Sequence, residues 1–176
     1  MYVPEQPLTG ERVVLRVATE ADAELLVAWH AEPDVSRQWG DETFTRDEMI
    51  ARLRRPSVDP YIIEEGNDPV GYVQAWFDDD VSRAGLDMFL IGSARGRGIG
   101  PDAARTVMRW LFSQPPIRRV TVDVYVSNRP AVRAWQKAGF RLVSQEPPDD
   151  ENEEPWFLMV VERSDEDAGG RPPSAV

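Results

Sequence analysis

The amino-acid sequence predicts a single α/β domain, and three observations support this fold class. Segments in which apolar and polar residues alternate, as in strands, are interspersed with segments that have helical spacing. The chain has 176 residues, the length of one domain, and 41% of them are hydrophobic, which is enough for a core. No internal repeat is visible. We therefore expect one domain over residues 1–163, followed by a polar, Pro- and Gly-rich tail over 164–176 that is disordered.

In the first half of the chain, local signals predict three strands and two helices. Alternating residues mark the strands, while Thr19 and Thr45 are good N-cap residues for the helices. A turn over 66–69 separates the second strand from the third. The expected elements are a strand over 11–19, a helix over 20–32, a loop over 33–43, a helix over 46–55, and strands over 60–65 and 70–77.

The second half of the chain predicts four strands and two helices. The first of these helices carries one buried stripe, formed by Ile99, Ala103, Val107, Trp110 and Leu111. Asn128 is the N-cap of the second helix, which covers 129–138 and stops at Gly139. The expected strands lie over 85–92, 118–125, 140–146 and 155–163.

The composition of the chain excludes several classes of function. The formal net charge is −11, which argues against nucleic acid as a partner because phosphates require a basic face. This charge suits a cationic small molecule, although acidic surfaces also serve solubility alone. With no cysteine and a single histidine, His30, thiolate chemistry and a metal site are not expected. No signal peptide or membrane span is visible, so we expect a cytoplasmic monomer or homodimer that does not bind membranes.

A glycine-rich loop separates the strand over 85–92 from the helix that follows. Within a few positions it contains three glycines and two arginines: Gly96, Gly98, Gly100, Arg95 and Arg97. Backbone N–H groups without neighbouring side chains approach a ligand closely, and the N-terminus of the following helix adds partial positive charge. The loop therefore predicts a pyrophosphate site, although a simple turn is the alternative. The spacing fits neither the dinucleotide motif nor the Walker A motif.

Two blocks of sequence resemble the GNAT acetyltransferase superfamily: Arg95-x-x-Gly98-x-Gly100 between a strand and a helix, and the stretch over 127–140. The resemblance implies a mixed, mostly antiparallel central sheet with helices on both faces, in which the fourth and fifth strands splay around the pantetheine arm of acetyl-CoA. It also implies that the loop binds the pyrophosphate of this co-substrate, while Asn128 is either a contact to it or a plain helix cap. The cofactor-binding residues implied are Phe89, Leu90, Ile91, Arg95, Gly96, Arg97, Gly98, Ile99, Gly100, Asn128, Ala131 and Trp135.

Within this superfamily, four stretches resemble the aminoglycoside 6′-N-acetyltransferases. They cover 38–42, 60–76, 85–92 and 122–128. The resemblance implies transfer of an acetyl group to the 6′-amine of an aminoglycoside antibiotic, which is a cationic small molecule, and a role in resistance.

Acidic residues within apolar strands are the candidates for the chemistry. An acceptor amine is protonated at neutral pH and must lose a proton before it attacks a thioester, and a carboxylate is able to bind and deprotonate it. Asp87 is the candidate catalytic base, because an acid in an apolar strand costs desolvation energy unless it has a partner. A solvent-facing strand end is the alternative. Asp123, in the next strand, is implied as a second contact to substrate amines, or else marks an edge position.

The remaining substrate-binding candidates come from the first half of the chain: Trp39, Glu42, Tyr61 and Gln74, with Trp76 beside them. Aromatic faces pack against sugar rings and attract cations. For Tyr61 and Trp76, a place in the core is the alternative.

One residue departs from the family pattern. Many members have a tyrosine that protonates the leaving thiolate where this chain has Trp135, so the general acid stays unassigned.

Acetylation of the N-terminal amine of a ribosomal protein is the alternative activity, since the stretch over 10–26 resembles that branch. A CoA-binding sensor or an antibiotic-sequestering protein is the alternative without catalysis. Siderophore-type acyl transfer is a further alternative, although the histidine expected for that activity has no obvious counterpart in this chain.

Overall fold

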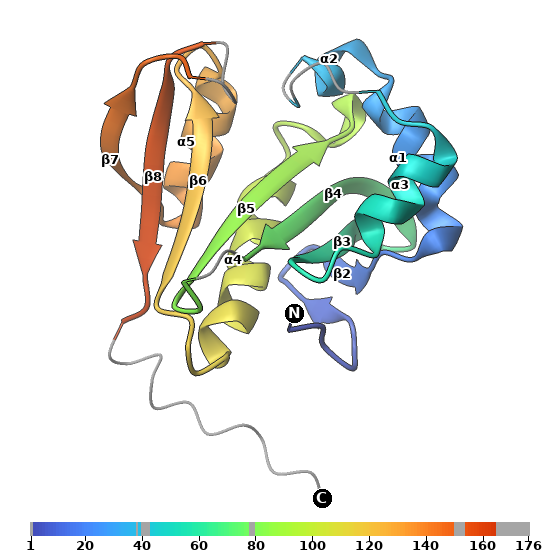
Figure 1. Ribbon diagram of the computed structural model, residues 1–176, viewed down its shortest axis with the longest axis horizontal. Helices are drawn as coiled ribbons and strands as arrows, with labels where there is room; N and C mark the ends of the chain where they lie inside the picture. Colours follow the sequence, from blue (N-terminus) through green and yellow to red (C-terminus); the bar gives the residue numbers. More distant parts are fainter. Residues whose placement is uncertain (1, 38, 40–42, 78–79, 150–153, 165–176) are drawn as a thin grey trace, which may run out of the picture.

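The computed structural model describes all residues except 1, 38, 40–42, 78–79, 150–153 and 165–176 (Figure 1). The strands are β1 (Leu8–Thr9), β2 (Val14–Val17), β3 (Val58–Glu65), β4 (Asp68–Trp76), β5 (Arg83–Leu90), β6 (Arg119–Tyr125), β7 (Arg141–Glu146) and β8 (Trp156–Glu162). The α-helices are α1 (Ala23–His30), α2 (Pro33–Ser36), α3 (Arg46–Leu53), α4 (Ile99–Ser113) and α5 (Arg129–Ala138). The short 3₁₀ helices η1 (Glu20–Asp22) and η2 (Gly92–Ala94) precede α1 and α4.

The strands form one mixed sheet in the order β1-β2-β3-β4-β5-β6-β8-β7. All neighbouring strands are antiparallel except β5 and β6, which are parallel. These two strands pair only where Arg83–Gly85 face Arg119–Thr121, and beyond this segment they diverge (Figure 1). The mostly antiparallel sheet with two splayed strands is therefore confirmed. The splayed strands are the fifth and sixth because β1 adds a strand at the edge.

Helices cover both faces of the sheet and close a separate core on each. Helix α4 buries Ile99, Ala103, Val107 and Leu111 against one face, whereas Trp110, expected in the same stripe, is only half-buried. Helices α1 and α3 bury Leu26, Met49 and Leu53 against the other. Because α4 and α5 follow the strands on either side of the split, they place their N-termini beside it (Figure 1).

Local signals predicted most elements, but the strand expected over 11–19 is shorter (β2), the helix expected over 20–32 begins with the 3₁₀ turn η1, and two short elements were not expected. The expected loop over 33–43 contains α2, a single turn that begins at Pro33, a residue well suited to the first position of a helix. Strand β1 is only two residues long, too short for any periodicity to reveal. The expected disordered tail lies outside the described residues, apart from Ser164. In the part of the chain that the structure describes, no helix is long and apolar enough to cross a membrane.

A buried carboxylate ties the N-terminal hairpin to the start of α4. Asp102, in the first turn of this helix, is 1% exposed. Its oxygens accept hydrogen bonds from the backbone N–H groups of Glu11, Arg12 and Val13 at 3.2, 2.8 and 3.3 Å. Hydrogen bonds from several N–H groups satisfy a buried carboxylate. The β1–β2 turn is therefore held against the helix that follows the glycine-rich loop.

Candidate active site

The glycine-rich loop adopts a conformation that requires glycine. Gly96 and Gly98 have φ angles of 72° and 85°, in the left-handed region, and Gly98 is the N-cap of α4. A Cβ atom built on either residue would meet nothing within 4 Å, so both face open space. The N–H groups in the first turn of a helix have no partner within that helix. The loop therefore presents backbone donors to a space that a ligand is able to fill, as the sequence predicts for a pyrophosphate.

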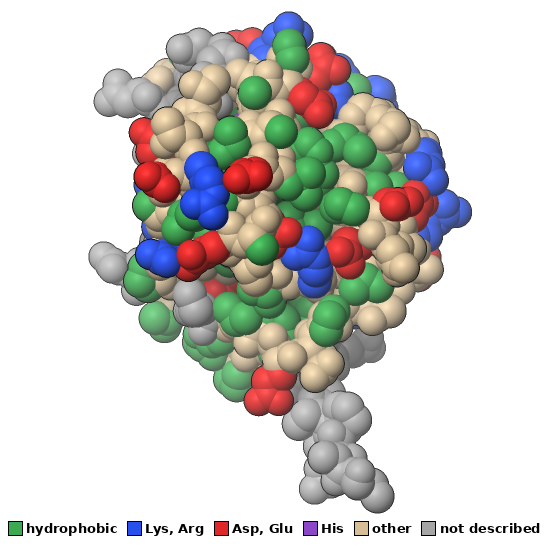
Figure 2. Space-filling view, turned by 90° about the vertical axis from the view of Figure 1, so that its right-hand side faces the viewer, with side chains coloured by type: hydrophobic (Ala, Val, Ile, Leu, Met, Phe, Trp, Pro, Cys, Tyr) green, Lys and Arg blue, Asp and Glu red, His purple; other side chains and the backbone are tan. Residues whose placement is uncertain are grey.

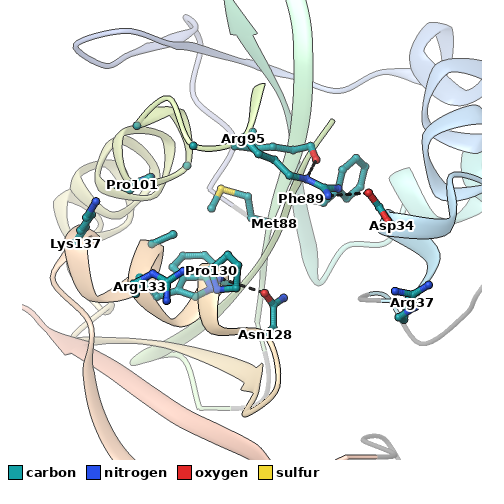
Figure 3. A pocket seen from close by; sticks show the side chains of 17 residues that line it. Asp34, Arg37, Met88, Phe89, Arg95, Pro101, Asn128, Pro130, Arg133 and Lys137 are labelled. Atoms are coloured by element: carbon teal, nitrogen blue, oxygen red, sulfur yellow. Dashed lines mark hydrogen bonds and ion pairs between the residues drawn. The ribbon is translucent and has the colours of Figure 1, made fainter. Parts of the chain in front are cut away.

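A cavity of about 480 Å³ opens beside this loop, between β5 and the helices α2, α4 and α5 (Figure 3). Its lining residues come from α2, β5, the loop, α4 and α5: Asp34, Arg37, Met88, Phe89, Leu90, Arg95, Gly96, Gly98, Gly100, Pro101, Asn128, Pro130, Ala131, Arg133, Ala134, Trp135 and Lys137. A partly apolar cavity beside a loop with free backbone donors is suited to a pantetheine arm and its pyrophosphate.

The structure brings most of the expected cofactor-binding residues to this cavity. Those that line it are Phe89, Leu90, Arg95, Gly96, Gly98, Gly100, Asn128, Ala131 and Trp135. Three others lie elsewhere. Ile99 is fully buried in the core below α4, and Ile91 packs against the two cores. The Arg97 side chain is directed away and pairs with Glu65 at 2.7 Å.

Sequence reasoning missed residues on two helices. Arg133 and Lys137 of α5 line the cavity, four residues apart and therefore on one helix face. Two cations on one face of the helix after Asn128, in an acidic chain, could have indicated from the sequence that this face binds an anionic ligand. Asp34 and Arg37 come from α2 and its end, in a segment predicted to be a loop, and no local signal connects them to the cavity.

Two polar residues at the cavity have a structural partner. The Asn128 side-chain oxygen accepts a hydrogen bond from the N–H of Ala131 at 3.2 Å, so Asn128 caps α5 and also lines the cavity. The Arg95 guanidinium donates from Nε to the Leu90 carbonyl at 2.9 Å and from Nη1 to Asp34 at 3.2 Å (Figure 3). Arg95 thus connects the glycine-rich loop to α2.

Asp87 lies in a hydrogen-bonded group on the face of the sheet covered by α1 and α3. Gln74 donates from Nε2 to Asp87 Oδ2 at 2.7 Å, and the Tyr72 hydroxyl donates to Gln74 Oε1 at 3.1 Å. The Trp76 side chain also forms a hydrogen bond with Asp87. Because alternate residues of a strand share a face, Tyr72, Gln74 and Trp76 of β4 all reach this side of the sheet. The orientation of the Asp87 carboxylate is therefore fixed by its neighbours.

Gly85 makes the contact between Trp76 and Asp87 possible. It faces Trp76 across the β4–β5 pair, as Gln74 faces Asp87. A Cβ atom at Gly85 would lie 1.9 Å from Cε2 of the Trp76 ring. The indole therefore lies directly on the backbone of β5, and any larger residue at position 85 would displace it.

The environment of Asp87 suits a proton acceptor. Burial raises the pKa of this half-buried carboxyl above its ordinary value, while the Gln74 hydrogen bond, the charge of Arg52 and the Trp76 hydrogen bond act in the opposite direction. A carboxylate with a raised pKa holds a proton more readily than a free aspartate does, and so is a better base.

Asp123 lies on the same face of the sheet, on the opposite side of the split. Gly85 and Thr121 are the last residues to pair between β5 and β6. Two positions further along each strand are Asp87 and Asp123, whose side chains point to the same face as Gly85 and Thr121. Asp123 is exposed. The two carboxylates therefore flank the point at which the strands diverge.

Aromatic residues pack together on the face of the sheet that carries Asp87. The ring of Trp39 lies 5.2 Å from His30 and 5.4 Å from Phe89, measured between ring centroids. The Arg52 guanidinium lies 5.9 Å from the Trp39 centroid. His30 is 1% exposed, and burial lowers the pKa of its imidazole to about 4. Trp39 thus occupies the side on which an acceptor was expected. Glu42 lies outside the described residues.

The expected place of Tyr61 beside the acceptor is wrong. Tyr61 is completely buried and belongs to the core below α4. It pairs with Val73 across the β3–β4 ladder, and Val73 belongs to the same core. Gln74, one residue further along β4, points to the opposite face. The position of Tyr61 in the alternation of β3 therefore decides its surroundings.

In the described parts of the chain, no group of three or more His, Cys, Asp or Glu residues is arranged to hold a metal ion. The groups that surround the split are carboxylates, amides, aromatic rings and backbone donors. This set suits acid–base chemistry on an organic substrate.

The family model for the acetyltransferase (GNAT) domain matches residues 18–146. The chain belongs to the GNAT acetyltransferase family. As a GNAT enzyme it is an N-acetyltransferase that uses acetyl-CoA as its co-substrate.

Among curated proteins, the chain is 27% identical to the aminoglycoside N(6′)-acetyltransferase type 1 of Klebsiella pneumoniae over 151 residues, which cover 75% of each chain. The structure of AAC(6′)-Ib with paromomycin and acetyl-CoA is similar, with a TM-score of 0.78 and 26% identity, over 94% of this chain and 100% of that one. AAC(6′)-Ib with coenzyme A and kanamycin aligns with a TM-score of 0.75 and 27% identity, over 86% and 95%. The GNAT fold and the relationship to this group are therefore established.

Proposed function

We propose that this GNAT enzyme acetylates the 6′-amine of an aminoglycoside. The observation that carries the proposal is the pair of carboxylates, Asp87 and Asp123, on one face of the sheet and on the two sides of the split. A polycationic amine gains from two separate carboxylates, one at the reacting nitrogen and one at a neighbouring ammonium group. The names of the relatives at 26–27% identity support the same substrate class.

The net charge of −11 does not by itself select such a substrate. The side of the molecule that carries α1 and α3 has acidic and basic side chains intermingled around a hydrophobic group (Figure 2). No single sign of charge covers this side. Recognition of a cation therefore rests on the individual carboxylates near the split, of which the half-buried Asp87 is the less screened by water and Asp123 is exposed.

In the proposed reaction, Asp87 accepts a proton from the bound ammonium group, directly or through a water molecule. Bound acetyl-CoA supplies a thioester whose carbonyl carbon is open to attack. The free amine forms the new C–N bond, the C–S bond breaks, and the sulfur leaves as the thiolate of coenzyme A. The second proton that the nitrogen loses as the amide forms goes to this thiolate or to solvent. Gln74 and Trp76 keep Asp87 directed toward the substrate. The acceptor loses one positive charge, which is the proposed basis of a resistance function.

The test is a thiol-release assay on the full chain with acetyl-CoA and a panel of acceptors. Neomycin and paromomycin form a matched pair, because paromomycin carries a hydroxyl group in place of the 6′-amine. We expect release of free thiol with neomycin and kanamycin, with one acetyl group added by mass spectrometry, and none with paromomycin.

Other outcomes of this assay contradict the proposal. Equal release with neomycin and paromomycin assigns the reaction to a different amine of the antibiotic. Release with basic peptides but not with aminoglycosides indicates a protein acetyltransferase. Binding of coenzyme A without release for any acceptor indicates a sensor or a sequestering protein.

A further inference from the structure

Three polar side chains form a row on the face of the sheet covered by α1 and α3: Tyr72, Gln74 and Asp87. Tyr72 and Gln74 are 1% and 3% exposed, and Asp87 is half-buried. Gln74 faces Asp87 directly across the β4–β5 ladder. Tyr72 precedes Gln74 by two residues and therefore shares its face of β4. The row leads from the interior of the protein to the carboxylate beside the split.

The hydrogen bonds of this row all run toward Asp87. The Tyr72 hydroxyl donates to Gln74 Oε1 at 3.1 Å, and Gln74 Nε2 donates to Asp87 Oδ2 at 2.7 Å. An ionised carboxylate only accepts hydrogen bonds, whereas an amide has one donating end and one accepting end. Gln74 therefore stabilises ionised Asp87 only when its NH₂ end faces the carboxylate. Its buried Oε1 then requires a donor, and the Tyr72 hydroxyl supplies it.

Tyr72 is held so that only its hydroxyl takes part in this row. The centroid of its ring lies 5.8 Å from that of Phe89 and 6.2 Å from that of Trp39. Burial raises the pKa of the Tyr72 hydroxyl well above its ordinary value, so the group stays protonated and remains a donor. Tyr72 thus reaches the carboxylate through the Gln74 amide.

The other charged and titratable groups around Asp87 act in a different way. The charge of Arg52 on α3 and the Trp76 hydrogen bond both lower the pKa of the Asp87 carboxyl. His30 of α1 is neutral at physiological pH, since burial lowers its pKa to about 4. Asp123 lies across the split on β6. A charge acts over a distance and does not select an orientation, whereas a hydrogen bond is directional.

We propose that Tyr72 is a positioning residue for the reaction: its hydroxyl fixes the orientation of the Gln74 amide, and this amide keeps Asp87 ionised and correctly directed. Without the hydroxyl, the amide is able to turn its Oε1 toward Asp87, where two acceptors face each other and the carboxylate ionises less readily. The inference rests on the proposed function, because it takes Asp87 as the base. The identity of the acceptor amine does not enter it.

The test is Tyr72→Phe, which keeps the ring and its packing but removes the hydroxyl. Two quantities are measured on the full chain: the pH profile of kcat/KM with neomycin, and the pKa of the Asp87 carboxyl by NMR of its carbon, which needs no acceptor. We expect the acidic limb of the profile and this pKa to move to higher pH together. We expect kcat to fall by about 3- to 10-fold, the range for loss of one hydrogen bond, and KM for acetyl-CoA to stay unchanged.

Two further variants separate positioning from packing. Gln74→Met replaces the amide by an apolar side chain of similar size, and in this background Tyr72→Phe is expected to change neither the limb nor kcat any further. Tyr61→Phe is the matched control, because Tyr61 is equally buried but belongs to the opposite core. It is expected to leave both the limb and the pKa of the Asp87 carboxyl unmoved.

Several outcomes overturn the inference. They are an unmoved limb and pKa in Tyr72→Phe, effects of Tyr72→Phe and Gln74→Met that add in the double variant, or an equal shift in Tyr61→Phe. The two measurements also distinguish this failure from that of the proposed function. A raised pKa in Tyr72→Phe without acetylation of any aminoglycoside by the wild-type protein contradicts the proposed function alone. Acetylation by the wild-type protein with an unmoved pKa in Tyr72→Phe contradicts the inference alone.

Discussion

The site for acetyl-CoA and the site proposed for the acceptor amine are built from different kinds of groups. On the cofactor side, the segment over 88–101 and helix α5 supply most of the lining residues, and the glycines of the loop leave its backbone N–H groups open to a ligand. On the acceptor side, the groups are side chains from separate elements: Gln74 and Trp76 from β4, Asp87 from β5, and Asp123 from β6.

This difference predicts two kinds of sensitivity. When a site consists of backbone N–H groups, most side-chain substitutions leave its affinity for the ligand unchanged. Replacing a glycine reduces that affinity, because the added atoms block access to the backbone. A site made of side chains depends on single functional groups, and its geometry depends on strand register. Substitutions in the cofactor site are therefore expected to change the affinity for acetyl-CoA, and substitutions in the acceptor site are expected to change turnover of the amine.

The largest effect is expected on the acceptor side, from Asp87→Asn. We expect turnover of a 6′-amino aminoglycoside to fall on the order of 10²-fold or more, the range for loss of a general base. The affinity for coenzyme A should stay unchanged, because asparagine is nearly isosteric and its oxygen still accepts the Gln74 hydrogen bond. Steady-state kinetics and calorimetry measure the two quantities separately.

Asp123→Asn is the companion variant on the other strand. Since we propose that Asp123 binds a second ammonium group, we expect the Asp123→Asn variant to raise KM for the acceptor more than it lowers kcat. A wild-type kcat and a wild-type acceptor KM in Asp87→Asn would contradict its role as the base and redirect attention to Asp123 or a bound water molecule.

The next effect is expected on the cofactor side, from Gly98→Val. We expect affinity for coenzyme A to fall about tenfold or more, because the side chain enters the open space where the phosphates bind. The left-handed φ of 85° adds strain of roughly 1–2 kcal/mol to the folded state.

Gly66→Val separates strain from blockage. Gly66 has a φ of 64° and open space around it, but it lies in the turn between β3 and β4 and does not line the cavity. It is expected to lower the melting temperature by a similar amount and to leave affinity for coenzyme A unchanged. Equal affinity losses in the two variants would mean that strain, and not the phosphate site, explains the effect.

The smallest effect is expected from Trp76→Phe, which keeps an aromatic ring but removes the indole N–H. That donor lowers the pKa of the Asp87 carboxyl, so its loss raises this pKa further. A base works only when deprotonated. The acidic limb of the pH profile of kcat/KM is therefore expected to move to higher pH, while the plateau falls by less than about tenfold. A lowered plateau with an unmoved limb would indicate that Trp76 acts through packing alone.

Elements with complete local signals were predicted closely. Helix α5 begins after Asn128 and ends before Gly139, as expected, because a cap, a proline in the first turn and a C-terminal glycine all act within a few residues. Helix α3 likewise follows its Thr45 cap. Local signals also predicted the glycine-rich loop between β5 and α4, and the position of Asp87 within a strand.

The surroundings of the individual site residues depended on contacts between distant segments. Sequence alone predicted a backbone anion site after β5 and placed an acid within this strand. Only the tertiary structure decided that Trp76 lies on Gly85 and that Tyr61 belongs to the opposite core. The physical reason is that a cap or a positive φ is a property of neighbouring residues, whereas strand register and helix packing are fixed by burial of the whole chain.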